Sequence, residues 1–384
     1  MRAFIAGPNF SGRSEMLRSG LRQGETFLLG PYAEAALSGL SSTVADEIAI
    51  YARPSSRPVF APLDWFSLGH RKPATLSGGE QVLLALHCFS RSDYRMIGID
   101  TALEQLDQQN RAAAVAYLGT HPSFDVMLVD NRLEDVPGWT RLDASAGSSD
   151  YACDLPAVGP GLKPRDAPVI GVHGLDFAYG PDRPIFRDVT LSLEPGRVYR
   201  LTGPNGAGKT TFFKLLVGVL RPTRGTVALD GAAYDPWRAG NLVFALATQN
   251  PDHQWCGATL AEDIARRRRA LAASPHVLPP DDARLSALAR CLGIHATDQH
   301  LYELPLAARK RLTWLWPLSG AMPWVMLDEP TIGQDEHTRA ALAVVLSRLG
   351  GLGHGIILVT HDDDFAGRIP HRLLHIEART VQVA

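Results

Sequence analysis

The sequence predicts an α/β protein made of two successive domains, each built on a mostly parallel sheet. Short apolar segments between helix-like segments carry this prediction, and the clearest are VMLD, which ends at residue 328, and IILV, which ends at residue 359. Segments of the same kind, RAFIAG, RMIGID and DVMLVD, follow one another in the first third of the chain. Strands that alternate with helices favour parallel sheets, whose ligands bind at the carboxyl ends of the strands.

The domain boundaries follow from turn-forming residues. Pro and Gly become frequent between residues 137 and 167, as in PGWTRLDASAGSSD, which is typical of a linker. We therefore expect a first domain over residues 1–136, a linker over residues 137–167 and a second domain over residues 168–384. The similar order of segments on the two sides of the linker indicates a domain duplication rather than a solenoid.

Composition narrows the class of protein. The 384 residues carry a formal net charge of −2, and this near-neutral balance argues against a nucleic-acid binder. No apolar run approaches the roughly 18 residues of a membrane helix, and the first residues lack the apolar core of a signal peptide. We therefore expect a cytoplasmic protein that reaches the cytoplasmic face of a membrane through a partner. The scattered cysteines are expected to be reduced thiols: Cys88, Cys153, Cys256 and Cys291.

A phosphate-binding loop stands in the middle of the chain. GPNGAGKTT, residues 203–211, fits the pattern G-x-x-x-x-G-K-[ST] between a predicted strand and a predicted helix. In such a loop backbone N–H groups surround the phosphates, Lys209 contacts the β- and γ-phosphates, and the hydroxyl of Thr210 holds Mg²⁺. The residues expected to bind ATP here are Gly203, Asn205, Gly206, Gly208, Lys209, Thr210 and Thr211.

Polar residues follow three predicted strands of the second domain. Asp328 ends an apolar strand and suits Mg²⁺ coordination, and Glu329 comes next, where a carboxylate can orient or deprotonate a water molecule. His361 follows IILVT and is expected to contact the γ-phosphate and the attacking water. Gln249 follows FALAT, and its amide is expected to contact the same water or Mg²⁺.

The set GPNGAGKTT, Gln249, MLDEP, GQD and THD, in this order, resembles the nucleotide-binding domain of ATP-binding cassette (ABC) proteins. The resemblance covers nearly all of residues 168–384 and, more weakly, residues 1–135. It implies a P-loop NTPase fold and ATP hydrolysis with Mg²⁺. It also implies that Tyr179 stacks on adenine and that Asp335 lies in a loop between the two domains.

ABC proteins also carry an LSGGQ-like signature ahead of a helix, whose first amides bind the γ-phosphate of a nucleotide held by the opposite domain. The first domain carries an intact one, LSGGE, with Ser77, Gly78 and Gly79. The second domain has LPLAA from Leu304, where Pro305 lacks an N–H group and bulkier residues replace the glycines. The signature of the second domain is therefore expected to be inactive.

The first domain shows the opposite losses. Its loop, GPNFSGRSE, has Arg13 in place of the lysine, although Gly12 and Ser14 fit the pattern. Thr101 follows Asp100 where a glutamate is expected, and Asn131 stands at the place of the histidine. The resemblance thus implies two ABC-type domains in tandem, the N-terminal one trimmed and degenerate. Because ABC domains associate head to tail, it also implies an intramolecular pseudo-dimer with one hydrolytic composite site and one degenerate site.

The stretch QNPDHQWCGATLAEDI, from Gln249, resembles the corresponding loop of energy-coupling-factor (ECF) importer ATPases. In that family the ATPases bind a membrane-embedded coupling subunit, and a small membrane protein captures a vitamin or a transition-metal ion. Two other readings stay open: a soluble tandem ABC ATPase that acts on ribosomes or DNA, and the ATPase of an ABC exporter. The single basic run, RRRR at residues 266–269, is expected to solvate a helix rather than bind nucleic acid.

Overall fold

The computed structural model describes most of the chain. The described residues are 1–6, 13–22, 24–54, 57–131, 136–143, 167–204, 206–235, 243–272, 280–294, 298–304 and 306–383. Two of the expected site residues, Gly12 and Asn205, lie outside them. The chain forms two compact units, Met1–Ser149 with Ile332–Glu336, and Asp150–Thr331 with His337–Ala384. The division at residue 149 falls within the segment expected to be a linker.

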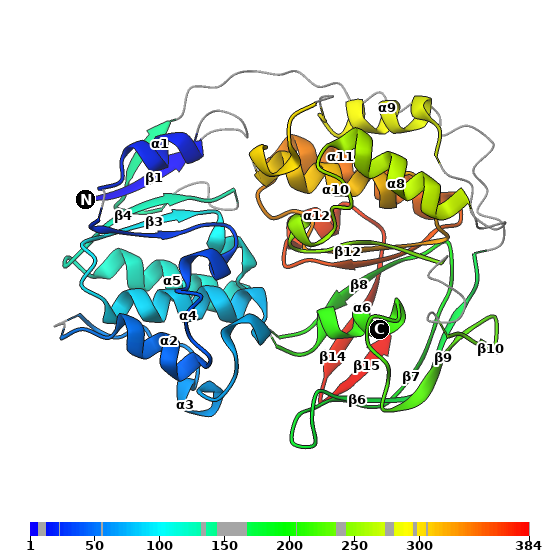
Figure 1. Cartoon of the computed structure of the whole chain (residues 1–384), viewed down its shortest axis with the longest axis horizontal. Helices are drawn as coiled ribbons and strands as arrows, with labels where there is room; N and C mark the ends of the chain where they lie inside the picture. The colour runs from blue at the N-terminus through cyan, green and yellow to red at the C-terminus, as the bar shows by residue number, and fades with distance from the viewer. Residues whose placement is uncertain are drawn as a thin grey trace. The chain divides into compact units, whose positions relative to one another are not determined.

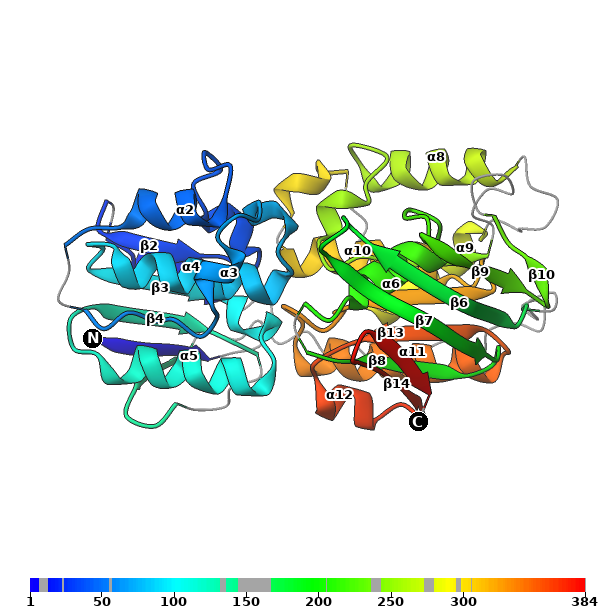
Figure 2. The same ribbon diagram turned by 90° about the horizontal axis from the view of Figure 1, so that it is seen from below.

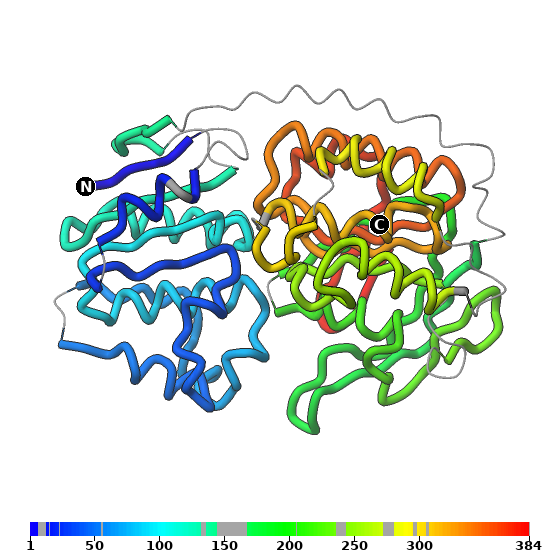
Figure 3. The backbone as a smooth tube through the Cα atoms, turned by 45° about the horizontal axis from the view of Figure 1, so that its top comes forward, coloured from blue at the N-terminus to red at the C-terminus, as the bar shows by residue number. Residues whose placement is uncertain are grey.

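The first unit contains one five-stranded sheet in which all neighbouring strands are parallel. Its order is β2-β3-β4-β1-β5, and Figure 3 shows β1 and β4, which are distant in sequence, running side by side. The strands are β1 (Arg2–Ala6), β2 (Thr26–Leu29), β3 (Met96–Asp100), β4 (Asp125–Val129) and β5 (Thr140–Asp143). The α-helices are α1 (Arg13–Ser19), α2 (Val44–Tyr51), α3 (Trp65–Leu68), α4 (Gly78–Arg91) and α5 (Gln108–Thr120).

Helices cover both faces of this sheet (Figure 1). Leu17 of α1 packs with Ile5 and Met127 on one face. Phe89 of α4 and Leu118 of α5 pack on the other face in a larger apolar cluster. Both faces of a parallel sheet must be buried, which explains why its strands read as nearly continuous apolar runs in the sequence.

The second unit contains two sheets. The antiparallel sheet, of order β10-β9-β6-β7, is made of β6 (Ile170–Ala178), β7 (Pro184–Leu193), β9 (Arg224–Leu229) and β10 (Ala232–Ala233). The six-stranded sheet has the order β11-β12-β13-β8-β14-β15 and is parallel except for β15. Its strands are β8 (Val198–Thr202), β11 (Phe244–Ala247), β12 (Trp324–Asp328), β13 (Gly355–Val359), β14 (Arg372–Glu377) and β15 (Thr380–Val383).

The helices of the second unit pack around the six-stranded sheet. Helix α6 lies between this sheet and the antiparallel one (Figure 2), where Phe212 and Phe213 join their apolar residues in one core. Trp314 of α10 and Leu342 of α11 pack on the opposite face. The α-helices are α6 (Lys209–Leu216), α8 (Leu260–Ala272), α9 (Asp282–Cys291), α10 (Leu306–Leu318), α11 (Glu336–Gly351) and α12 (Asp363–Gly367).

Two expectations about the whole chain can be compared with the structure. Cys88 and Cys256 carry free thiols, but Cys291 is disulfide-bonded, so the expectation of a reduced thiol is wrong for that residue. Within the described residues, no helix is both long enough and apolar enough to span a bilayer.

Candidate active site

The phosphate loop connects the end of β8 to the start of α6. Gly203, Gly206 and Gly208 have φ angles of 149°, 79° and 106°, which residues with a side chain rarely adopt. A Cβ atom at Gly208 would also lie 2.6 Å from Cγ2 of Ile185 on β7. The loop therefore requires these glycines, and it brings the first amides of α6 to the edge of the sheet.

Lys209 lies over this loop. Its Nζ donates to the backbone oxygens of Gly203 at 2.8 Å and of Pro204 at 3.1 Å. The ammonium is thus held above the backbone that is expected to surround the phosphates. A lysine at the first turn of a helix adds its charge to the positive end of the helix dipole, and both favour an anion at this place.

A pair of oxygen ligands stands beside the loop. Thr210 Oγ1 donates to Oδ2 of Asp328 at 2.9 Å, and Asp328 is only 5% exposed. Burial, and next the charge of Glu329, raise the pKa of Asp328 to about 6. A hydroxyl and a buried carboxylate in contact are the hard oxygen donors that Mg²⁺ accepts together with phosphate oxygens, so these residues fit the ion. Among the described residues, no three His, Cys, Asp or Glu side chains gather as an alternative metal site.

Glu329 and His361 are brought together after β12 and β13. The Nε2 atom of His361 lies 3.6 Å from Oε1 of Glu329, and its backbone N–H donates to Oε2 at 3.3 Å. Glu329 has a φ of 47°, which is uncommon for a residue with a side chain. Its backbone N–H donates to the oxygen of Val359 at 2.9 Å, and this bond fixes the unusual turn. Local strain of this kind is frequent at catalytic positions.

Gln249 lies at the same edge of the sheet. Ala247, the last residue of β11, pairs with Leu327 of β12, and Gln249 and Glu329 each come two residues after this pair. The backbone oxygen of Gln249 accepts a hydrogen bond from Lys310 Nζ at 2.8 Å. Contact of its amide with water or metal stays a prediction.

Tyr179 follows the end of β6 with its ring 48% exposed. The guanidinium carbon of Arg183 lies 5.2 Å from the ring centroid, and the hydroxyl group hydrogen-bonds with Thr211 Oγ1 at 3.1 Å. Thr211 belongs to the phosphate loop helix, so the ring is tied to the loop while one face of it reaches solvent. An exposed ring held in this way suits stacking of a nucleotide base, which stays a prediction.

The signature of the first unit forms a helix N-terminus. Ser77 caps α4: its Oγ accepts from the N–H of Glu80 at 3.3 Å, and the Glu80 carboxylate accepts from the N–H of Ser77 at 2.7 Å. Gly78 and Gly79 occupy the first turn. No side chain from these two glycines covers the amides at the start of α4, as binding of a phosphate there requires. Asp335 lies in the segment Ile332–Glu336 of the same unit, and the proximity of these residues to a nucleotide stays a prediction.

The degenerate loop residues of the first unit take part in a polar network. The Nη2 atom of Arg13 donates to Oδ1 of Asn131 at 2.6 Å, and Asn131 donates from its backbone and its side chain to Oε1 of Glu104, each at 2.8 Å. Glu104 is fully buried. Burial lowers the pKa of Arg13, while the charges of Glu104 and Asp100 act in the opposite direction.

The remaining degenerate residues match the second unit closely. Burial raises the pKa of Asp100, which accepts a hydrogen bond from Ser14 as Asp328 does from Thr210. Thr101 has a φ of 57°, and its N–H donates to the oxygen of Val129 at 2.8 Å. This geometry repeats that of Glu329, with a hydroxyl in place of the carboxylate.

Sequence reasoning missed two of these residues, Glu104 and Lys310. Glu104 lies in ALEQ, and Lys310 lies in ARKR, where charged residues usually mark a solvated face. Only their burial, 0% and 1% exposed, shows that both are interior groups.

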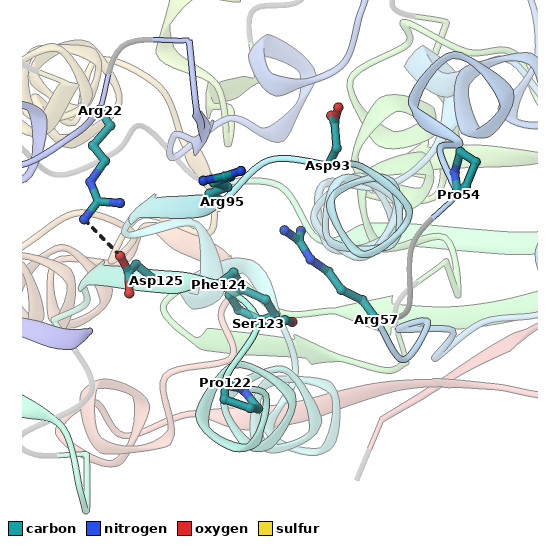
Figure 4. Close-up of a pocket in the computed structure, with 9 residues that line it drawn as sticks. All are labelled: Arg22, Pro54, Arg57, Asp93, Arg95, Pro122, Ser123, Phe124 and Asp125. Carbon is teal, nitrogen blue, oxygen red and sulfur yellow. Dashed lines mark ion pairs between the residues drawn. The ribbon is translucent and has the colours of Figure 1, made fainter.

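A cavity of about 530 Å³ in the first unit lies away from these residues (Figure 4). It is at the opposite edge of the sheet, where β3 and β4 begin, and Arg95 and Asp125 line it. Arg22 pairs with Asp125 at 3.3 Å, and the guanidinium of Arg57 lies over the ring of Phe124. Because the cavity lies where β3 and β4 begin, away from the ends of these strands at Asp100 and Val129, it has no part in the candidate active site.

Known proteins resemble the chain over the same regions. The profile described as ABC transporter matches residues 186–332. The energy-coupling factor transporter ATP-binding protein EcfA1 of Thermotoga maritima is 30% identical, with 55% of this chain and 80% of the relative covered. A putative ABC transporter ATP-binding protein of Thermosynechococcus vestitus is 33% identical, with 52% and 71% covered. The putative HMP/thiamine import ATP-binding protein YkoD of Bacillus subtilis is 24% identical, with 83% and 69% covered. Together with the phosphate loop and the carboxylates beside it, these matches establish that the chain belongs to the ABC transporter ATP-binding proteins and is an ATP hydrolase.

Proposed function

We propose that this chain is the complete motor of an ECF-type importer, with two ABC-type domains fused in one polypeptide and one hydrolytic site. The observation that carries the proposal is the division of intact motifs. The phosphate loop, Asp328, Glu329 and His361 belong to the second domain, whereas the intact signature with Ser77 and Gly78 belongs to the first. Random loss of motifs would not be expected to leave one complete set.

The fold supports an ABC-type origin of the first domain. Its sheet order, β2-β3-β4-β1-β5, equals the order β11-β12-β13-β8-β14 of the second, strand for strand. The backbones of Thr101 and Glu329 share a positive φ and the same hydrogen bond to the neighbouring strand. The similarity to YkoD also extends over 83% of the chain, well beyond the second domain.

The chemistry of the proposed site follows from its groups. Lys209 and the first amides of α6 hold the phosphates, and the hydroxyl of Ser77 with the amides of Gly78 and Gly79 completes the site from the other domain. Glu329 orients a water molecule and accepts its proton, while His361 holds the same water near the γ-phosphate. Thr210, Asp328 and Gln249 would hold Mg²⁺, which supplies positive charge that neutralises the phosphates. Asp335, in the loop that follows Asp328 and Glu329, is proposed to contribute to ATP binding between the two domains.

The site of the first domain is proposed to be inactive. Glu329 has Thr101 as its counterpart, which cannot accept a proton from water, and His361 has Asn131 as its counterpart. Arg13 donates a hydrogen bond to Asn131. ATP binding and domain closure at the single productive site would then drive transport, and hydrolysis would separate the domains.

The importer class is proposed from the loop that starts at Gln249 and from the similarity to EcfA1. On this proposal the chain binds the cytoplasmic face of the plasma membrane through a membrane-embedded coupling subunit. A substrate-capture subunit would deliver a vitamin or a transition-metal ion. Co-purification of the chain with a multi-spanning membrane protein supports this assignment, and co-sedimentation with ribosomes contradicts it.

The composite site is tested with Ser77→Arg, which places a bulky cation at the signature. We expect ATP turnover to fall by at least about 100-fold, because the substitution removes the interactions that the opposite domain makes with the γ-phosphate. The matched control is Pro305→Arg in the inactive signature, which is expected to change turnover less than about 2-fold. Strong activity of Ser77→Arg would defeat the composite site.

A further inference from the structure

Helix α10 carries a lysine that is almost completely buried. Lys310 is 1% exposed, and its Nζ donates to the backbone oxygen of Gln249 at 2.8 Å. Removing an ammonium group from water is unfavourable unless hydrogen bonds and opposite charges compensate for it. A buried lysine at the edge of a hydrolytic site is therefore a candidate for a specific task.

The neighbouring residue reinforces the same connection. Arg309 Nη1 lies 2.9 Å from each carboxylate oxygen of Asp252, and the N–H of Asp252 donates to Oδ1 of Asn250 at 2.9 Å. Helix α10 thus contacts both ends of the segment 249–252: Lys310 contacts Gln249, and Arg309 contacts Asp252. The segment is a turn fixed to α10, and a displacement of α10 is transmitted to Gln249.

The first domain has an apolar residue at the helix position that corresponds to Lys310. Lys310 lies six residues after Leu304, and the residue six positions after Leu76 is Val82, which is fully buried. An apolar side chain therefore fills the equivalent place in α4. In the first domain Leu29 pairs with Ile99 as Ala247 pairs with Leu327, so Pro31 stands at the place of Gln249. The buried lysine and the glutamine that it contacts therefore occur together, in the second domain only.

We propose that Lys310 is a positioning residue for ATP hydrolysis, which fixes Gln249 through the hydrogen bond to its backbone oxygen. The inference rests on the proposed role of Gln249 in the hydrolytic site. On this assignment the signature helix of the second domain, which has lost its phosphate-binding glycines, serves the site of its own domain. Lys310 does not itself contact the nucleotide.

The kinetic test compares Lys310→Met, which keeps the chain length and removes the charge, with Lys310→Arg, which keeps charge and donors. We expect Lys310→Met to lower kcat by about 10- to 100-fold with KM for ATP changed less than about 3-fold. We expect Lys310→Arg to keep kcat within about 3-fold of the parent. The matched control is Lys214→Met, an exposed lysine on α6, with no change expected.

Two further readouts separate positioning from general damage to the fold. Amide hydrogen exchange of residues 249–254 in the nucleotide-free protein should accelerate in Lys310→Met, with exchange in β12 and β13 unchanged. In a double-mutant cycle, Lys310→Met should cost little further kcat once Gln249→Ala is present.

Three results would overturn the proposal: full kcat in Lys310→Met, full additivity in the cycle, or at least about a 10-fold loss of kcat in folded Lys310→Arg. If Gln249→Ala alone leaves kcat unchanged, the proposed role of Gln249 fails instead. That outcome is distinct, because the exchange experiment still reports whether Lys310 holds the loop.

Discussion

Helices α1 and α6 each begin with a cationic residue, and the hydrogen-bond partners of these two residues differ. Arg13 starts α1 and Lys209 starts α6, each after the first strand of a parallel sheet with the same strand order. Lys209 lies on the oxygens of its own loop, whereas Arg13 donates to Asn131 after β4. The comparison teaches that the same strand order can surround cations with different partners, a loop backbone for Lys209 and a side-chain amide for Arg13.

Those partners are specific to the first domain. Asn131 stands where the second domain has His361, and buried Glu104 stands where it has the apolar Ile332. A buried carboxylate requires hydrogen bonds or a cation; Asn131 and the backbone N–H of Gly333 donate to Glu104, and Arg13 supplies a nearby charge. The polar side chains of this network therefore satisfy one another inside the first unit.

The largest difference between the domains is expected in turnover. Glu329→Gln should lower kcat by about 100- to 10,000-fold, because the amide cannot accept a proton from water. Thr101→Ala, at the same place in the first domain, should leave kcat within about 2-fold of the parent. Steady-state ATPase assays measure both. Equal losses in the two variants would mean that both sites hydrolyse ATP.

Substitution of Lys209 and substitution of Arg13 should have different effects on the affinity for ATP. Lys209→Ala should weaken ATP binding at least about 100-fold, since it removes a charge-assisted contact with the phosphates, whereas Arg13→Ala should leave affinity unchanged. Calorimetric titration in the Glu329→Gln background, where ATP persists, also gives the stoichiometry. We expect one nucleotide per chain, and two equivalent binding events would contradict the internal role of Arg13.

A pH-dependent stability difference should appear at Asp328. Its folded-state pKa, about 6, is above the ordinary value of 3.8, so the folded state binds more protons between these values. Stability from this group is present below about pH 4 and is lost as pH rises through 6. Asp328→Asn should therefore stabilise the metal-free protein by at most about 3 kcal/mol at pH 7.5, and by at most about 1 kcal/mol at pH 4.5.

Urea unfolding at the two pH values provides the measurement. Asp100→Asn is the matched variant, because burial raises the pKa of Asp100 in the same direction. A stabilisation that is independent of pH would assign the effect to packing rather than to the carboxylate charge.

The smallest expected effect concerns the backbone after β3. Thr101 is β-branched and has a φ of 57°, a conformation that costs of order 1 kcal/mol for such a residue. Thr101→Gly should therefore stabilise the first domain by about 1 kcal/mol, as seen in its unfolding midpoint. Thr43→Gly, at the cap of α2 where φ is −135°, is the control and should not stabilise. No gain at Thr101 would indicate that its side-chain hydrogen bond offsets the strain.

Much of this architecture could be predicted from the sequence. Apolar strands such as β12 and β13 are continuous because both faces of the sheet are covered, and the loop glycines need φ angles that only glycine adopts readily. Glu104 and Lys310 could not be predicted. Their partners lie 27 and 61 residues away in the chain, and only the folded structure shows that these charges are interior.

Gly208 and Ile185 connect two parts of the second unit that the sequence separates. Strand β7, which pairs with the strand that leads to Tyr179, lies against the phosphate loop so closely that Gly208 has no room for a Cβ atom. The residues proposed to bind the base and the phosphates are therefore joined by direct packing. On this proposal, a larger residue at position 185 weakens ATP binding by displacing the loop, so variants of the antiparallel sheet belong in any screen for weak nucleotide binding.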